Sequence, residues 1–153
     1  MRLHHLMLFL HLLGVIVWVG GMAFAWACLR PAAGALAPPE RLALWVAVLK
    51  RFFAMVWVSV ALVASSGLTM LVATGFARAP LAWHAMLVSG SVMIAVFVSI
   101  WFGPWPALCA AQAGQDWAKG AAALGRIRQR VALNLLLASI TLAVATLGLA
   151  FQS

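Results

Sequence analysis

Acidic residues are nearly absent from this sequence. Among its 153 residues only Glu40 and Asp116 carry carboxylates, and they lie far apart along the chain. Chemistry that needs two carboxylates in one site, such as glycoside hydrolysis, is therefore not expected. The sequence also lacks a recognisable Ser-His-Asp or Cys-His arrangement, a phosphate-binding loop and a Cys-x-x-Cys pair. It therefore shows no residue pattern for hydrolytic or nucleotide chemistry.

Charge of either sign is scarce. Charged residues make up 8% of the chain and hydrophobic residues 67%, against about 25% and about 45–50% in an average soluble domain. A water-soluble fold is therefore not expected. The net charge of +8 could suggest nucleic acid, but the basic residues stand singly between long apolar runs. They do not form the solvated basic face that a phosphate backbone requires, so we expect no nucleic-acid partner.

Long uncharged runs are what the sequence does contain. Four intervals lack Asp, Glu, Lys and Arg, and each exceeds the ~20 residues needed to cross a bilayer. The third is too long for one crossing, and Gly103-Pro104-Trp105-Pro106 gives it an exit because proline cannot continue a helix. We predict an all-α integral membrane four-helix bundle in one domain, residues 1–153, with spans at 3–29, 52–74, 81–103 and 131–151.

The polar connections are less defined. Residues 40–51 either begin the second helix early or lie along the membrane interface, and residues 107–130 are expected to be partly helical. Cytoplasmic loops carry an excess of Lys and Arg, and all basic residues except Arg2 and Arg78 fall on one side of this topology. We therefore predict a bacterial-type inner-membrane protein with both termini outside, in the periplasm, and with no disulfide between Cys28 and Cys109.

Histidines are the informative polar residues, because ionisable groups inside a bilayer are costly. His11 and His84 both fall in the predicted outer half of the bundle, where two helices could ligate one metal or haem. Each candidate also has an ordinary structural role as its alternative. The methionines could simply fill space in the packing, His4 could be a hydrated residue at the membrane boundary, and His84 could cap its helix or form an interfacial hydrogen bond. One face of the first helix carries His4, Met7, His11, Gly14 and Trp18, and the third helix adds Met86 beside His84.

The first helix carries a recognisable pattern, His-x6-Trp-x-Gly-Gly, at residues 11–21. It resembles the opening helix of the CopD (copper resistance D-like) membrane proteins. The resemblance extends over nearly the full length through Arg51-Phe52-Phe53, Ser66-Gly67-Leu68 and Trp83-His84-Ala85-Met86. It implies copper uptake or resistance, with an outward-facing Cu(I) site whose candidate ligands are His4, Met7, His11, His84 and Met86.

The same spacing is similar to the first helix of HemJ, the membrane protoporphyrinogen oxidase that binds b-type haem through its first-helix histidine. This resemblance implies haem b with His11 as an axial ligand. By its predicted depth His84 would be the ligand opposite, ahead of Met86, and Arg78 on the same side could pair with a propionate. HemJ has an essential lysine early in its third helix. Residues 83–86 contain none, which argues against protoporphyrinogen oxidation.

Two functions remain open at this point. We rank a haem-binding redox or electron-transfer protein ahead of a copper-binding protein, because a transport path below His11 and Met86 offers few polar or soft groups. The expected partners are the lipid bilayer and a quinol or a periplasmic redox or copper protein. Whether the protein is a membrane oxidoreductase, and whether it forms a homo-oligomer, the sequence leaves open.

Overall fold

Helices joined by short turns make up the part of the chain that the computed structural model describes, residues 2–150, with side chains described for 3–146. No strand occurs within this part. The elements in chain order are α1 (Arg2–Phe24), the π-helix η1 (Ala25–Leu29), α2 (Arg30–Ala33), α3 (Pro38–Thr74), the 3-10 helix η2 (Phe76–Arg78), α4 (Leu81–Phe102), α5 (Pro104–Ala113) and α6 (Trp117–Ala150).

Four helical stretches are long and apolar enough to cross a membrane, which confirms the predicted all-α, four-span fold. The molecule is thus a multi-pass membrane protein. The third stretch contains the break between α4 and α5, because Pro104 cannot continue the ladder of α4 and instead becomes the first residue of α5. The four stretches are Leu3–Ala33, Pro38–Thr74, Leu81–Ala113 and Trp117–Thr146.

Two helices start before the predicted spans, in line with the alternative that residues 40–51 begin the second helix early and with the partly helical connection expected over residues 107–130. α3 begins at Pro38 rather than at residue 52, and α6 begins at Trp117 rather than at residue 131. The expected starts followed charged residues such as Lys50 and Arg51, but charge does not end a helix, and long basic side chains extend to water from within one. Proline at the first helical position sets the true start of α3. The predicted end of the last span, residue 151, lies outside the described residues.

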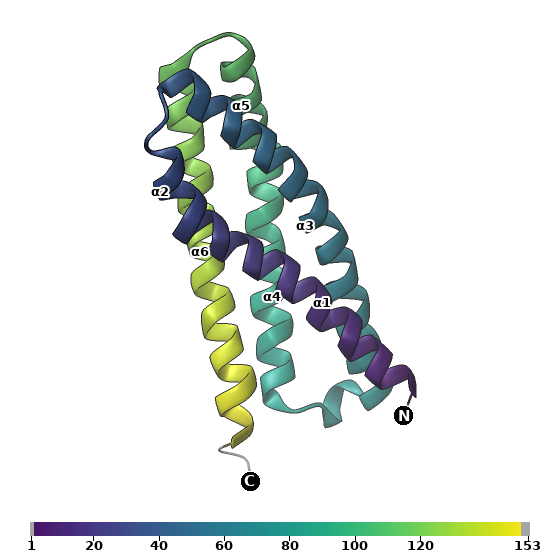
Figure 1. Ribbon diagram of the computed structural model, residues 1–153. Coiled ribbons are helices and arrows are strands. Elements are labelled where there is room, and N and C mark those ends of the chain that lie inside the picture. Colours follow the sequence, from purple (N-terminus) through teal and green to yellow (C-terminus); the bar gives the residue numbers. More distant parts are fainter. Residues whose placement is uncertain (1, 151–153) are drawn as a thin grey trace.

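The helices form two antiparallel pairs. α1 packs along α3, α4 packs along α6, and α5 continues beyond α4 and packs against the start of α6 (Figure 1). We call the end with α2, α5 and the starts of α3 and α6 the basic end. The opposite end carries η2, the start of α1 and the end of α6, and we call it the terminal end (Figure 1). The side chain of Arg2, expected there, is outside the described residues.

The two pairs meet in an aromatic cluster. Phe53 of α3 lies edge-on to Phe97 of α4 and to Trp105 of α5, with ring centroids 5.7 and 5.2 Å apart. Trp18 of α1 also meets Phe97 edge-on, at 6.3 Å. Edge-to-face pairs at these distances add to the stabilisation from burial alone. The core therefore fixes the helix pairs near mid-length and towards the basic end.

Candidate metal site between α1 and α3

Close helix contact brings His11 against α3. A Cβ added at Gly14 would fall 2.8 Å from Val63 Cγ2, and one at Gly67 would fall 3.2 Å from His11 Cε1. Small residues let membrane helices approach in this way. The His11 ring accordingly lies half-buried in the seam between the two helices, nearer to the terminal end.

Hydrogen bonds determine which ring nitrogen of His11 carries the proton. Nδ1 lies 3.2 Å from Val63 O and 3.1 Å from Ser66 Oγ. The carbonyl can only accept, and the Ser66 hydroxyl donates its own proton to Leu62 O at 2.5 Å. Both neighbours of Nδ1 therefore accept, so the neutral ring is protonated at Nδ1 and keeps its lone pair on Nε2. This is the arrangement by which proteins orient a histidine that binds a metal.

The register between α1 and α3 aligns two methionines with His11. Along the antiparallel pair Gly14 meets Val63, and His11 meets Ser66. One turn further towards the terminal end, the same register places Met7 opposite Met70. Both methionines are half-buried, whereas their neighbours Leu6, Leu8 and Leu68 are 51%, 40% and 56% exposed. The helix register therefore puts one imidazole and two thioethers at successive positions along the facing sides of α1 and α3.

Ser66 was not among the predicted site residues, and Met70, considered as a soft side chain at the outer end of the second span, was not placed opposite Met7. The signal that could have identified them is the spacing of 63, 66, 67 and 70, which places these positions on one face of a helix. Their partner face on α1 carries 7, 11 and 14 with the complementary spacing. Pairing the face of α3 with the face of α1 requires the register between the two helices. Composition and hydropathy do not encode that register.

His84 lies at the start of α4, in the other helix pair. Its Nδ1 lies 3.2 Å from Pro80 O, and its ring packs edge-on against Phe76 with centroids 4.7 Å apart. Because a carbonyl oxygen can only accept, this contact caps no free N–H at the start of α4, and it resembles the hydrogen bonding considered as the other role of His84. No hydrogen bond or ring contact within the described residues joins His84 to His11, and a shared centre for the two stays a prediction.

The remaining predicted ligands are scattered. His4 is exposed on α1 with its ring edge-on to that of His5 at 6.0 Å, Met86 is half-buried on α4, and Arg78 is exposed in η2. Within the described residues there is no group of three or more His, Cys, Asp or Glu side chains that could hold a metal.

The fold and the seam define a class: a multi-pass helical membrane protein whose first two spans hold an oriented histidine. The sequence model of the family described as Copper resistance protein D, CopD, matches residues 46–147. The match covers more than half of the chain, which therefore belongs to the CopD family, as the sequence resemblance predicted. It begins after α1, so His11 lies outside the matched part. No curated protein and no solved structure matches the chain.

Proposed function

We propose that this CopD-family protein binds Cu(I) in the membrane through His11 Nε2 and the thioethers of Met7 and Met70. The observation that carries the proposal is the pair of acceptors around His11 Nδ1, Val63 O and Ser66 Oγ. They leave Nε2 as the coordinating atom and fix the orientation of the ring. The family description, which refers to copper resistance, supports the choice of metal.

The ligand chemistry favours Cu(I) over harder metals. Thioether and imidazole ligands suit Cu(I), whereas Mg²⁺ and Ca²⁺ prefer carboxylates and carbonyls. A monocation held by neutral ligands also requires less charge compensation in an apolar seam than a divalent ion does. The seam lies nearer the terminal end, which the distribution of basic residues predicts to be periplasmic in a bacterial inner membrane. Copper arriving from that compartment would reach this half of the bundle first.

Haem b with electron transfer remains the second candidate, because His11 Nε2 would serve equally as an axial ligand. The ranking from the sequence is nevertheless reversed here. The family description points to copper, and the described contacts of His84 are local to the start of α4. A partner that delivers or accepts copper on the periplasmic side, in place of a quinol, follows from the same proposal.

A Cu(I) titration against a chromophoric chelator, under anaerobic conditions, tests the proposal. The background carries Cys28→Ser and Cys109→Ser, so that thiols cannot bind the ion. We expect one Cu(I) per chain, with affinity lowered at least about tenfold by His11→Ala or Met70→Leu and about tenfold by Ser66→Ala, which removes one acceptor from Nδ1.

Met86→Leu is the matched control, since Leu and Met have similar volumes and Met86 is outside the seam. Its affinity should equal that of the parent chain. Equal losses in Met86→Leu and Met70→Leu would contradict the proposed ligand set. A Soret band in the purified protein that His11→Ala abolishes would establish haem instead.

A further inference from the structure

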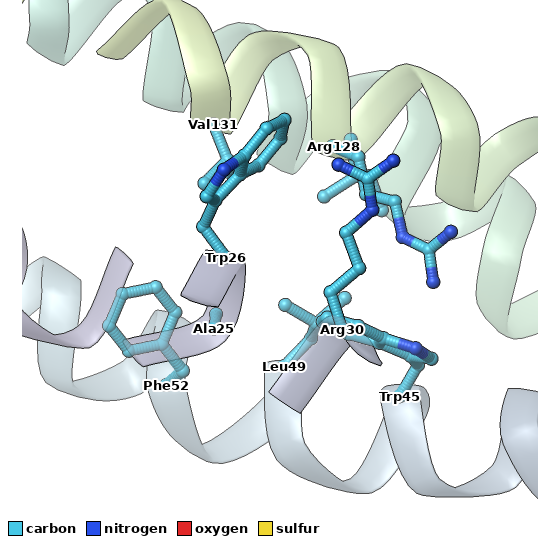
Figure 2. Close-up of a pocket in the computed structure, with 9 residues that line it drawn as sticks. Ala25, Trp26, Arg30, Trp45, Leu49, Phe52, Arg128 and Val131 are labelled. Carbon is cyan, nitrogen blue, oxygen red and sulfur yellow. The ribbon is translucent and has the colours of Figure 1, made fainter. Parts of the chain in front are cut away.

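A second cluster of polar side chains lies at the basic end, away from His11. Figure 2 shows a pocket between η1, α3 and α6 with Arg30 and Arg128 reaching into it from opposite sides. Trp26 and Trp45 stand beside the two arginines. Its apolar wall is formed by Leu49, Phe52, Ile127 and Val131.

The pocket has several hydrogen-bond donors and no acceptor to match them. Arg128 Nε and Trp45 Nε1 are buried without a hydrogen-bond partner among the described residues, and Trp45 is only 3% exposed. Each of the two guanidinium groups instead stacks with its flat face on a tryptophan ring. Arg128 lies over the Trp45 ring at 5.0 Å and Arg30 over the Trp26 ring at 4.5 Å. Guanidinium stacking of this kind leaves the N–H edges available to a ligand.

No carboxylate among the described side chains forms an ion pair with the arginines of this pocket. Arg30 and Arg41 both lie close enough to Arg128 to repel it. Of the two carboxylates in the chain, Asp116 pairs with Lys119 at 2.8 Å, and no ion pair of Glu40 occurs within residues 3–146. Unpaired buried donors and uncompensated charge are costly. An anion with several acceptor oxygens would relieve both.

The π-helix contributes to the geometry of the pocket. η1 separates α1 from α2 over five residues, Ala25–Leu29, and Arg30 follows it directly. π-turns are rare and are found mostly at functional sites, because they widen the helix and change where the following side chains point. Trp26 lies within this π-turn, and Arg30 stacks on its ring. The local distortion thus coincides with the side chains that line the pocket.

We propose that Arg30, Arg128 and Trp45 bind the phosphate of an anionic phospholipid from the adjacent leaflet. A guanidinium fork matches phosphate oxygens, and basic pockets between membrane helices are known to accept lipid head groups. The apolar wall beside the arginines suits an acyl chain, which free phosphate lacks. Net negative charge on the head group is required to compensate the arginines.

Native mass spectrometry of the full-length protein, titrated with single lipids, tests this site. We expect phosphatidylglycerol to bind at least about tenfold more tightly than phosphatidylcholine, whose choline neutralises the phosphate. Arg30→Gln or Arg128→Gln should remove about tenfold of that affinity. Trp45→Phe retains a ring beneath Arg128 but lacks the indole donor, and should weaken binding severalfold while the protein remains folded.

Arg126→Gln is the matched control, because Arg126 is exposed on the same helix and outside this pocket. It should leave phosphatidylglycerol affinity within about twofold of the parent value. Equal binding of the two lipids, or an equal loss in Arg126→Gln and Arg128→Gln, would overturn the site. Displacement of phosphatidylglycerol by inorganic phosphate at similar concentrations would show a free-phosphate site and overturn the assignment to lipid.

Discussion

Gly14 and Gly20 lie on the same helix but have different surroundings. A Cβ at Gly14 would fall 2.8 Å from Val63 Cγ2 and 3.0 Å from the backbone oxygen of Ser59, whereas one at Gly20 would meet nothing within 4 Å. We expect Gly14→Ala to lower stability by about 1–3 kcal/mol because α3 must move away. Gly20→Ala should be neutral or stabilising by up to about 1 kcal/mol. Thermal unfolding of the two variants in one detergent, compared with the parent, measures both changes. Equal destabilisation by both would contradict the close packing at Gly14.

Individual site residues differ in how far the sequence identifies them. His11 was predicted because an ionisable side chain deep in an apolar run is unusual. The acceptors around its Nδ1 were not, since bringing Val63 and Ser66 against His11 requires the register between α1 and α3. Arg128 was counted only as a basic residue of a connecting segment. Its contact with Trp45 depends on the packing of α6 against α3, which no local pattern encodes.

Asp116 caps α6, a helix whose true start the sequence did not reveal. Its Oδ1 accepts the backbone N–H of Lys119 at 3.0 Å, and its Oδ2 lies 2.8 Å from Lys119 Nζ. The side-chain contact and then the backbone hydrogen bond hold the pKa of the Asp116 carboxyl below its ordinary value. The ionised carboxylate therefore stabilises the fold when the pH is above the ordinary pKa of an aspartate. This stabilisation is lost as the pH falls through the lowered pKa of Asp116.

We expect Asp116→Ala to lower thermal stability at neutral pH more than Asp116→Asn, because asparagine can still cap the helix. The parent protein should also lose more stability than Asp116→Asn between neutral pH and about pH 2. Unfolding temperatures measured across that range check both expectations. An identical pH profile for the parent and Asp116→Asn would show that the ionised carboxylate adds nothing.

The helical elements were predictable as spans but not in their full length. Uncharged runs located all four crossings, because the bilayer requires about 20 apolar residues in each. They could not show that α3 continues back to Pro38 or that α6 starts at Trp117. Those parts contain charged residues, and their helical state depends on packing among α3, α5 and α6. A hydropathy profile reports how apolar a segment is, and it carries no information on contacts between helices.

At the scale of the whole molecule, four crossings place the start of α1 and the end of α6 on the same side of the membrane. The concentration of basic residues at the opposite end predicts that this side is the periplasm. A C-terminal alkaline phosphatase fusion should therefore be active, while a C-terminal fusion to a fluorescent protein that folds only in the cytoplasm should remain dark. The reverse pattern would invert the orientation and place the His11 seam nearer the cytoplasm.

The length of α3 divides the molecule into two regions held together by different forces. Its 37 residues span about 55 Å at ~1.5 Å per residue, whereas the hydrocarbon layer is about 30 Å thick. Even a tilt of about 40° cannot contain it. Glu40 and Arg41 follow Pro38, so we expect the part of α3 near Pro38 to stand in the interfacial or aqueous layer, where Leu42 packs against Gly120. Water drives that packing, while lipid supplies no equivalent force between the spans. Urea should consequently loosen the protruding region at concentrations that leave the spans intact.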